Sequence, residues 1–224
     1  MNIDLNSVQT TLEPLLNWSQ IPLNMPSLIA LAAGLGWASG LRLYALVFIL
    51  GALDRFAGVT LPGDLNVLSN TWILGISGVL LLTEFFADKI PWLDSVWDTI
   101  HTFIRIPAGV ALAGAVMGDQ GAAMQVAMGL LGGTLAAGTH FAKAGTRAAI
   151  NTSPEPFSNV AASFSEDAMF AGGMWALLNH PVVFLIGLVI FIILAVALIY
   201  LLWRFIKALF QGLRRTTSNS GSLN

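Results

Sequence analysis

The sequence predicts an all-α, polytopic membrane protein with about six transmembrane helices, and two properties of the chain carry that prediction. Hydrophobic residues make up 56% of the 224 residues and charged residues only 10%, whereas a soluble domain carries about 25% charged residues. Several apolar runs approach or exceed the roughly 20 residues that a helix needs to cross a bilayer. The clearest of them, residues 181–203, has no charge before Arg204. We therefore expect the chain to lie in membrane lipid, in agreement with its mean hydropathy of +0.76.

The chain divides into a polar N-terminal segment, residues 1–26, a transmembrane domain, residues 27–210, and a C-terminal tail, residues 211–224. The N-terminal segment lacks the positive charges of a signal peptide, so we expect it to be retained. Its leucines recur at helical spacing, which favours either a short helix at the membrane surface or a poorly ordered tail. The Ser- and Asn-rich tail is expected to be disordered. The six predicted spans are residues 27–53, 72–88, 91–117, 122–141, 159–179 and 181–202.

Three of these spans carry local signals of how they pack. The first has Ala32, Gly36 and Gly40 at every fourth position, a row of small residues that lets another helix approach closely, within the bundle or in a homo-oligomer. The third begins at Pro91, and its internal Pro107 predicts a kink near Arg105.

The fifth span is interrupted by two acidic residues, Glu166 and Asp167, ahead of two glycines. Adjacent carboxyl groups in an apolar run predict a broken or re-entrant helix. The alternative is a helix that begins at Ser165, which would place both acids in its first turn at the interface.

The third span bears a stripe of ionisable residues on one face. At 100° per residue, Asp94, Asp98, His101 and Arg105 fall within about a 60° arc. An ionisable group that faces lipid costs at least about 2.5–3.5 kcal/mol, so this stripe must face other helices or water. We expect it to meet the basic stripe of the fourth span, with Lys143 and Arg147 as the partners of its acids.

Further polar residues lie near the same depth or in the neighbouring loops. Glu84 and Asp88 share a face near the end of the second span, where like charges repel unless a cation or proton is shared; Lys89 could instead neutralise them at the membrane edge. Arg42 either snorkels to the interface or faces the bundle interior. The predicted lining of a polar path is Asp94, Asp98, His101, Arg105, Glu84, Asp88, Arg42, Tyr44, Lys143, Arg147, Asn151, Glu155, Glu166 and Asp167.

Charge placement predicts orientation. With the C-terminus inside, the lysines and arginines at loop ends fall on the cytoplasmic side except Arg55, which predicts that both termini are cytoplasmic. Gly-x-Arg recurs at residues 40–42 and 145–147, each time after a span and before a proline-containing loop. Three spans per half would make the halves antiparallel, as in transporters built from inverted repeats.

Composition excludes several classes of site and partner. The chain has no cysteine, so disulfides and cysteine-based metal sites are excluded. It also lacks a basic tract of the kind that binds nucleic acid. Membrane lipids and a small ion or charged solute are the partners that remain, and no cofactor is expected.

Four segments are similar to a known family: SGLRLYA (39–45), EFFADKIPWLDSVWDTIHTFIRIPAG (84–109), HFAKAGTRAAINTSPEPFSN (140–159) and SEDAMFAGG (165–173). They resemble a bacterial family of multi-pass membrane proteins catalogued as domain of unknown function 4126. The resemblance runs from about residue 28 to residue 210. It implies an integral protein of the bacterial cytoplasmic membrane and carries no activity.

Function therefore has to be argued from the residues. The leading hypothesis is a transporter or channel for a small ion or charged solute, in which Asp98, His101 and Arg105 form the centre of the path. A structural or assembly protein with buried ion pairs is the first alternative. An intramembrane enzyme or carrier acting on a lipid phosphate is the second, although the chain has no G-x-S-x-G nucleophile motif. Asp94, Asp98 and His101 could also hold a divalent metal, although the neighbouring Arg105 argues against a cation there.

Overall fold

The computed structural model describes residues 24–151 and 157–220. Within these ranges the chain forms six long α-helices and two short 3₁₀ helices, without a strand, which confirms the all-α prediction. Most of the predicted N-terminal segment and Glu155 lie outside the described residues. The elements are α2 (Met25–Phe56), η1 (Gly63–Ser69), α3 (Thr71–Ala87), α4 (Pro91–Ala115), η2 (Gly118–Gln120), α5 (Ala122–Ile150), α6 (Phe157–Asn179) and α7 (Pro181–Ser220).

Length and apolarity mark part of this bundle as membrane-spanning. Among the described residues, three helical stretches are long and apolar enough to cross a bilayer: α2, α5 and residues Pro181–Leu201 of α7. The pair η1 and α3, bent by 73°, passes the same test when taken together. These helices support a membrane protein, while six crossings remain a prediction.

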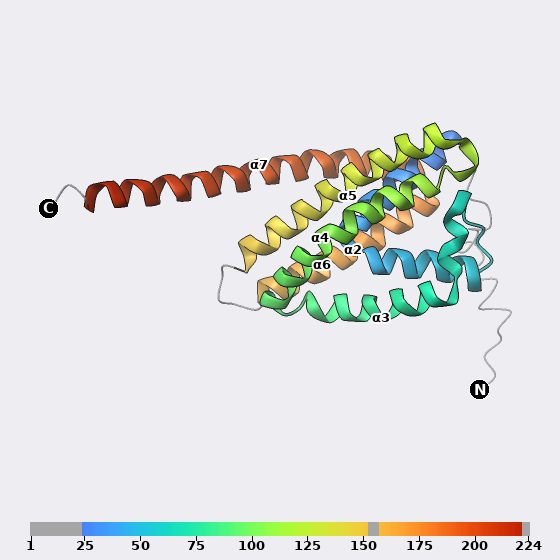
Figure 1. Ribbon diagram of the computed structural model, residues 1–224, viewed down its shortest axis with the longest axis horizontal. Coiled ribbons are helices and arrows are strands. Elements are labelled where there is room, and N and C mark those ends of the chain that lie inside the picture. Colours follow the sequence, from blue (N-terminus) through green and yellow to red (C-terminus); the bar gives the residue numbers. More distant parts are fainter. Residues whose placement is uncertain (1–23, 152–156, 221–224) are drawn as a thin grey trace.

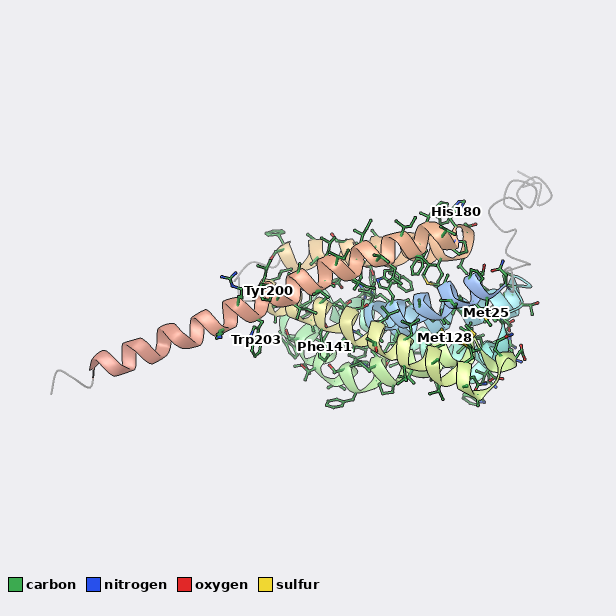
Figure 2. The ribbon with its side chains drawn as sticks, turned by 90° about the horizontal axis from the view of Figure 1, so that it is seen from above. Met25, Met128, Phe141, His180, Tyr200 and Trp203 are labelled. Atoms are coloured by element: carbon green, nitrogen blue, oxygen red, sulfur yellow. The ribbon has the colours of Figure 1, made fainter. Side chains whose placement is uncertain are left out.

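The distribution of side chains is that of a protein surrounded by lipid. The largest fully buried side chains include Arg42, Arg105 and Arg147, whereas Phe103 is 82% exposed. Figure 2 shows side chains projecting outward along the helices. In a water-soluble protein the distribution would be the reverse, because apolar side chains are buried there and charged side chains are left at the surface.

Helix boundaries follow from local chemistry. Pro91 opens α4 at the position where its missing N–H is harmless. The Asn70 side chain accepts a hydrogen bond from the N–H of Trp72 and caps α3. Gly121 has φ 89° ahead of α5, a conformation that suits glycine.

The helix α2 is broken at Arg42, whose φ of −141° and ψ of 69° are not helical. Before the break, Gly36 lies against Gly132 and Gly40 against Ala136, so this first half runs parallel to α5. After the break, Gly51 contacts Leu74 and Phe48 contacts Gly78, so the second half runs antiparallel to α3.

The directions of α3, α4 and α5 relative to one another show how the two halves of α2 run. Gly109 lies against Gly132 and Gly114 against Gln125, so α4 and α5 are antiparallel. A short turn joins α3 to α4, while η1 contacts the start of α3 and the end of α4. Since α3 and α5 therefore run the same way, α2 reverses at Arg42 and forms a re-entrant hairpin (Figure 1).

This reversal corrects the prediction that residues 27–53 are a single span. Met25 lies at the same end of the bundle as His180, whereas Tyr200 and Trp203 lie at the opposite end (Figure 2). The two ends of the described helical domain therefore lie at opposite ends of the bundle, while the cytoplasmic placement of both termini stays a prediction. Hydropathy measures how much apolar chain is present but not the direction in which that chain runs. The apolar hairpin was therefore predicted as one crossing.

Two further predictions are wrong. Residues 157–179 form one continuous helix, so α6 is neither broken at Glu166 and Asp167 nor started at Ser165. Both acids of α6 are met by cations of other helices, so they need no break in α6, and the broken helix is α2. The two Gly-x-Arg segments also run in the same direction, which excludes the inverted relation proposed for them.

The last helix is longer than predicted. It continues from Pro181 to Ser220, past residue 202 and through most of the tail expected to be disordered. Figure 1 shows its C-terminal part projecting beyond the ends of the other helices.

Candidate functional site

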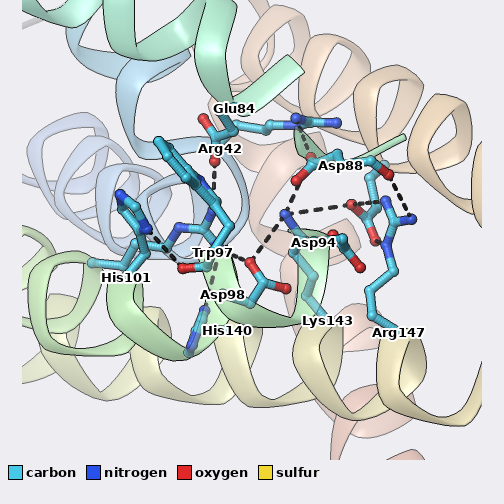
Figure 3. Close-up of polar contacts among 12 residues, drawn as sticks. Arg42, Glu84, Asp88, Asp94, Trp97, Asp98, His101, His140, Lys143 and Arg147 are labelled. Atoms are coloured by element: carbon cyan, nitrogen blue, oxygen red, sulfur yellow. Dashed lines mark hydrogen bonds and ion pairs between the residues drawn. The ribbon is translucent and has the colours of Figure 1, made fainter. Parts of the chain in front are cut away.

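A cluster of charged side chains lies inside the bundle, where five helices meet around the tip of the α2 hairpin (Figure 3). The side chains come from α2, α4, α5 and α6 and from the C-terminal end of α3. We call it the buried ion network, and its most accessible member is Asp167, whose side chain is 32% exposed. Its cations are Arg42, Arg105, Lys143 and Arg147, and its carboxylates are Glu84, Asp88, Asp98, Glu166 and Asp167.

Arg105 joins α4 to α3 and α5. Its Nη2 donates to Glu84 Oε1 at 2.5 Å and its Nη1 to Asp98 Oδ1 at 2.7 Å. His140 Nδ1 lies 3.3 Å from the same Nη1. The backbone carbonyl of Arg105 also accepts a hydrogen bond of 2.7 Å from Ser39 Oγ. The guanidinium is fully buried, so the bonds of its two Nη atoms replace part of its hydration, while its Nε has no hydrogen-bond partner among the described residues.

Arg42 anchors the break in α2. Its guanidinium pairs with Asp88 and, at 2.7 Å, with Asp167 Oδ1, and its Nη2 lies 3.5 Å from Ser163 Oγ. The hairpin tip is therefore held between the end of α3 and the middle of α6. A buried guanidinium needs such partners, because an unpaired charge in this setting is strongly unfavourable. Of the two predictions for Arg42, the interior position is confirmed and snorkelling is wrong.

Arg147 forms a bidentate pair with Glu166, with bonds of 2.8 and 2.9 Å. Its Nη1 donates to both oxygens of Asn159, the carbonyl and the side chain, at 2.8 Å each. The Asn159 amide in turn donates to the carbonyl of Asp88 at 3.0 Å. These contacts tie the C-terminal part of α5 to α6 and to the turn after α3.

Lys143 is held more loosely than the arginines. Its Nζ lies 3.4 Å from Asp88 Oδ2, 3.5 Å from Asp98 Oδ1 and 3.6 Å from Glu166 Oε2. Charge-assisted bonds of this kind are normally 2.7–2.9 Å long. The ammonium group therefore stands among three carboxylates without a short bond to any of them.

The network contains more negative than positive charge. Its ion pairs link five carboxylates to four cations, which leaves a net charge of −1 when all are ionised. Asp94, fully buried beside it and 3.4 Å from Asn151 Nδ2, adds a sixth carboxylate. One oxygen of each of four carboxylates has no hydrogen-bond partner among the described residues: Glu84 Oε2, Asp88 Oδ1, Asp94 Oδ1 and Asp98 Oδ2.

Several predicted residues are placed differently from expectation. His101 does not face Asp98: its Nδ1 lies 2.7 Å from the carbonyl of Trp97, and its ring stacks on the Trp97 indole with centroids 4.0 Å apart. The rings of Tyr44 and His101 pack edge to face, with their centroids 5.5 Å apart. Lys143 lies beside Asp98 as expected, whereas Arg147 pairs with Glu166 and Asp94 is met by Asn151.

His140 was not predicted as part of the path, yet it occupies the place expected of His101. It is fully buried, with Nε2 2.6 Å from Thr102 Oγ1 and Nδ1 facing Arg105. Its position three residues before Lys143 on the basic stripe was the available signal. Asn159 and Ser163 carried no such signal, because a neutral polar residue in an apolar run has many structural roles.

Two cavities border the network on either side of α5. One, of about 290 Å³ between α4 and α5, is lined by Asp98, His140 and Arg147. The other, of about 360 Å³ between α5, α6 and α7, is lined by Lys143 and Glu166. Within the described residues, no three His, Asp or Glu side chains are grouped so that they could hold a metal ion. The predicted set of Asp94, Asp98 and His101 does not converge.

Residues 29–201 match the family model of a domain of unknown function, DUF4126. The chain belongs to this family. The matched range contains every member of the buried ion network, so the DUF4126 region and the candidate site coincide. No curated protein and no solved structure matches the chain. The network itself is thus the basis for a functional proposal.

Proposed function

We propose that this protein moves protons or a small monovalent cation across a membrane, with the buried ion network as the site where the ion is exchanged. The observation that carries the proposal is the surplus of carboxylates over cations. A buried cluster with net negative charge is unfavourable unless a proton or cation compensates it. The four carboxylate oxygens without partners among the described residues are where such an ion would bind.

The broken helix α2 supports the same function. Transporters bind ions where discontinuous helices end inside the bilayer, because the half-helix ends carry free backbone groups and partial charges. Here the break at Arg42 brings the hairpin tip into the network, against Asp88 and Asp167. A change in the charge of either acid would act directly on the tip.

We further propose that the network lies toward the cytoplasmic side of a bacterial cytoplasmic membrane. The element order and helix directions place Lys89, Lys143, Arg147, Arg204 and Lys207 toward the end of the bundle where Trp203 is found, whereas the described part of the opposite end has Arg55 with Asp54, Asp64 and Asp119. Positive loops are cytoplasmic. This orientation places Met25 on the outer side.

A structural role is the second candidate, because each of the four cations has at least one carboxylate partner. Such pairs hold helices together without any transport. Binding of a lipid phosphate by the network is less favourable, since the anion would enter a site whose net charge is already negative.

Flux measurements on the full chain in vesicles separate the two candidates. We expect proton, Na⁺ or K⁺ flux that falls to the level of empty vesicles in Asp98→Asn and Glu84→Gln. Asp119→Asn, at the opposite end of the bundle, is the matched control and should keep its flux. The absence of any flux from the wild-type protein, together with lower unfolding temperatures of both network variants, would establish the structural role instead.

A further inference from the structure

A continuous apolar groove runs between α6 and α7 on the lipid-facing side of the bundle. It consists of the cavity of about 360 Å³ beside Lys143 and a second cavity of about 390 Å³. The two cavities share Met169, Phe191 and Leu194 as walls. The groove therefore extends from Val183, near the start of α7, to Leu198 beside the ion network.

The groove has the length of a lipid chain. Val183 and Leu198 are 15 positions apart, which corresponds to about 22 Å of helix. Half of the hydrocarbon core of a bilayer is about 15 Å thick. A whole acyl chain of one leaflet can thus lie along it.

Part of the groove wall leaves open space. A Cβ atom added at Gly187 would meet no atom within 4 Å, and Ala176 and Ala195 contribute only methyl groups. Trp37 of α2 forms part of the floor. Its indole N–H is buried and has no hydrogen-bond partner among the described residues.

One end of the groove is polar and charged. Lys143, Glu166, Ser165 and Thr146 line it at the end near Leu198. Glu166 belongs to the ion network, whose carboxylates outnumber its cations. Lys143 lines the same end, so the electrostatic match there is a head that carries both an ammonium and a phosphate group rather than a purely anionic head.

We propose that this groove binds a membrane lipid with an ammonium-bearing head, its acyl chain between α6 and α7 and its head toward Glu166. The lipid comes from the leaflet at the Trp203 end of the bundle, because the polar end of the groove faces that side. The proposal goes beyond ion movement and does not depend on it, since a structural network would present the same charge. The occupied groove would place a lipid head against the groups that hold the α2 hairpin.

Fluorescence quenching by brominated acyl chains tests the chain position. The full protein is reconstituted into phosphatidylethanolamine vesicles with and without brominated chains, and the contribution of Trp37 is the difference between wild type and Trp37→Phe. We expect strong quenching of Trp37, and we expect Gly187→Phe to remove it by filling the groove. Gly172→Phe is the matched control, because Gly172 also has open space around its Cβ but does not line the groove.

Native mass spectrometry of the purified protein gives a second readout that does not need the Trp37 variant. We expect one retained phosphatidylethanolamine molecule in wild type and Gly172→Phe, and none in Gly187→Phe. Brominated phosphatidylglycerol, with the same chains and an anionic head, should quench and bind less. Equal retention by both glycine variants would refute the groove as a lipid site. Equal or stronger binding of the anionic lipid would refute the preference for an ammonium head.

Discussion

At the scale of single residues, Arg105 is the cation that joins two helices inside the bundle, because its guanidinium pairs with both Glu84 and Asp98. The spacing of Asp94, Asp98 and Arg105 predicted a shared interior face, and all three are buried. Helical spacing fixes the direction in which a side chain leaves the helix, but not its rotamer. His101 therefore turns onto Trp97 one helical turn away, and His140 meets Arg105 in its place.

Replacement of Arg105 by Gln should be one of the most destabilising single changes in the network. It leaves Glu84 and Asp98 buried without their cation, and loss of one partner of a buried pair costs about 3–5 kcal/mol. The measurement is the free energy of unfolding in mixed micelles. Arg55→Gln removes an exposed arginine that bonds to Ser69 and Thr71 and should cost no more than about 1 kcal/mol.

The double variant Arg105→Gln with Glu84→Gln completes the test of direct contact. It replaces both members of the pair by neutral amides, so we expect it to recover part of the stability lost in Arg105→Gln alone. Strictly additive losses would contradict a direct interaction between the two residues.

At the scale of elements, the existence of the helices could be read from hydropathy, whereas the C-terminal ends of α5 and α7 and the path of α2 could not. A run of apolar residues shows how much chain prefers lipid but not whether that chain turns back. The reversal depends on contacts between distant segments, including Gly36 with Gly132 and Arg42 with Asp88 and Asp167. A single charged residue near the middle of an apolar run was the only local signal of the break.

Close packing at Gly36 gives a test of this element. An added Cβ would lie 2.5 Å from the Cα of Gly132, and backbone cannot move aside as a side chain can. We expect Gly36→Ala to lower the free energy of unfolding by about 1–3 kcal/mol. Gly138→Ala in α5 is the control, since its Cβ meets open space and the higher helix propensity of Ala stabilises by up to about 1 kcal/mol. Equal effects of the two changes would argue against the parallel packing of α2 on α5.

At the scale of the whole molecule, the α2 hairpin decides the topology. A full crossing by α2 would bring Met25 to the side of Lys207, as the charge distribution alone suggested. The reversal at Arg42 leaves α3 to α7 as the helices that run from end to end, so Met25 and Lys207 lie at opposite ends of the bundle. Counting positive charges could not reveal this, because that rule assigns sides only after the crossings have been counted correctly.

Accessibility of single cysteines tests this topology directly, because the chain has no cysteine of its own. Met25, Asp119 and Lys207 are exposed positions at the ends of the bundle, and each is replaced by Cys in turn. With an impermeant maleimide applied to intact cells, we expect labelling of Met25→Cys and Asp119→Cys and none of Lys207→Cys until the membrane is permeabilised. Asp119 serves as the reference for the outer side, since a hairpin and a full crossing by α2 place it alike relative to Lys207. Labelling of Met25→Cys only after permeabilisation, together with Lys207→Cys, would show that α2 crosses the membrane and that the hairpin is wrong.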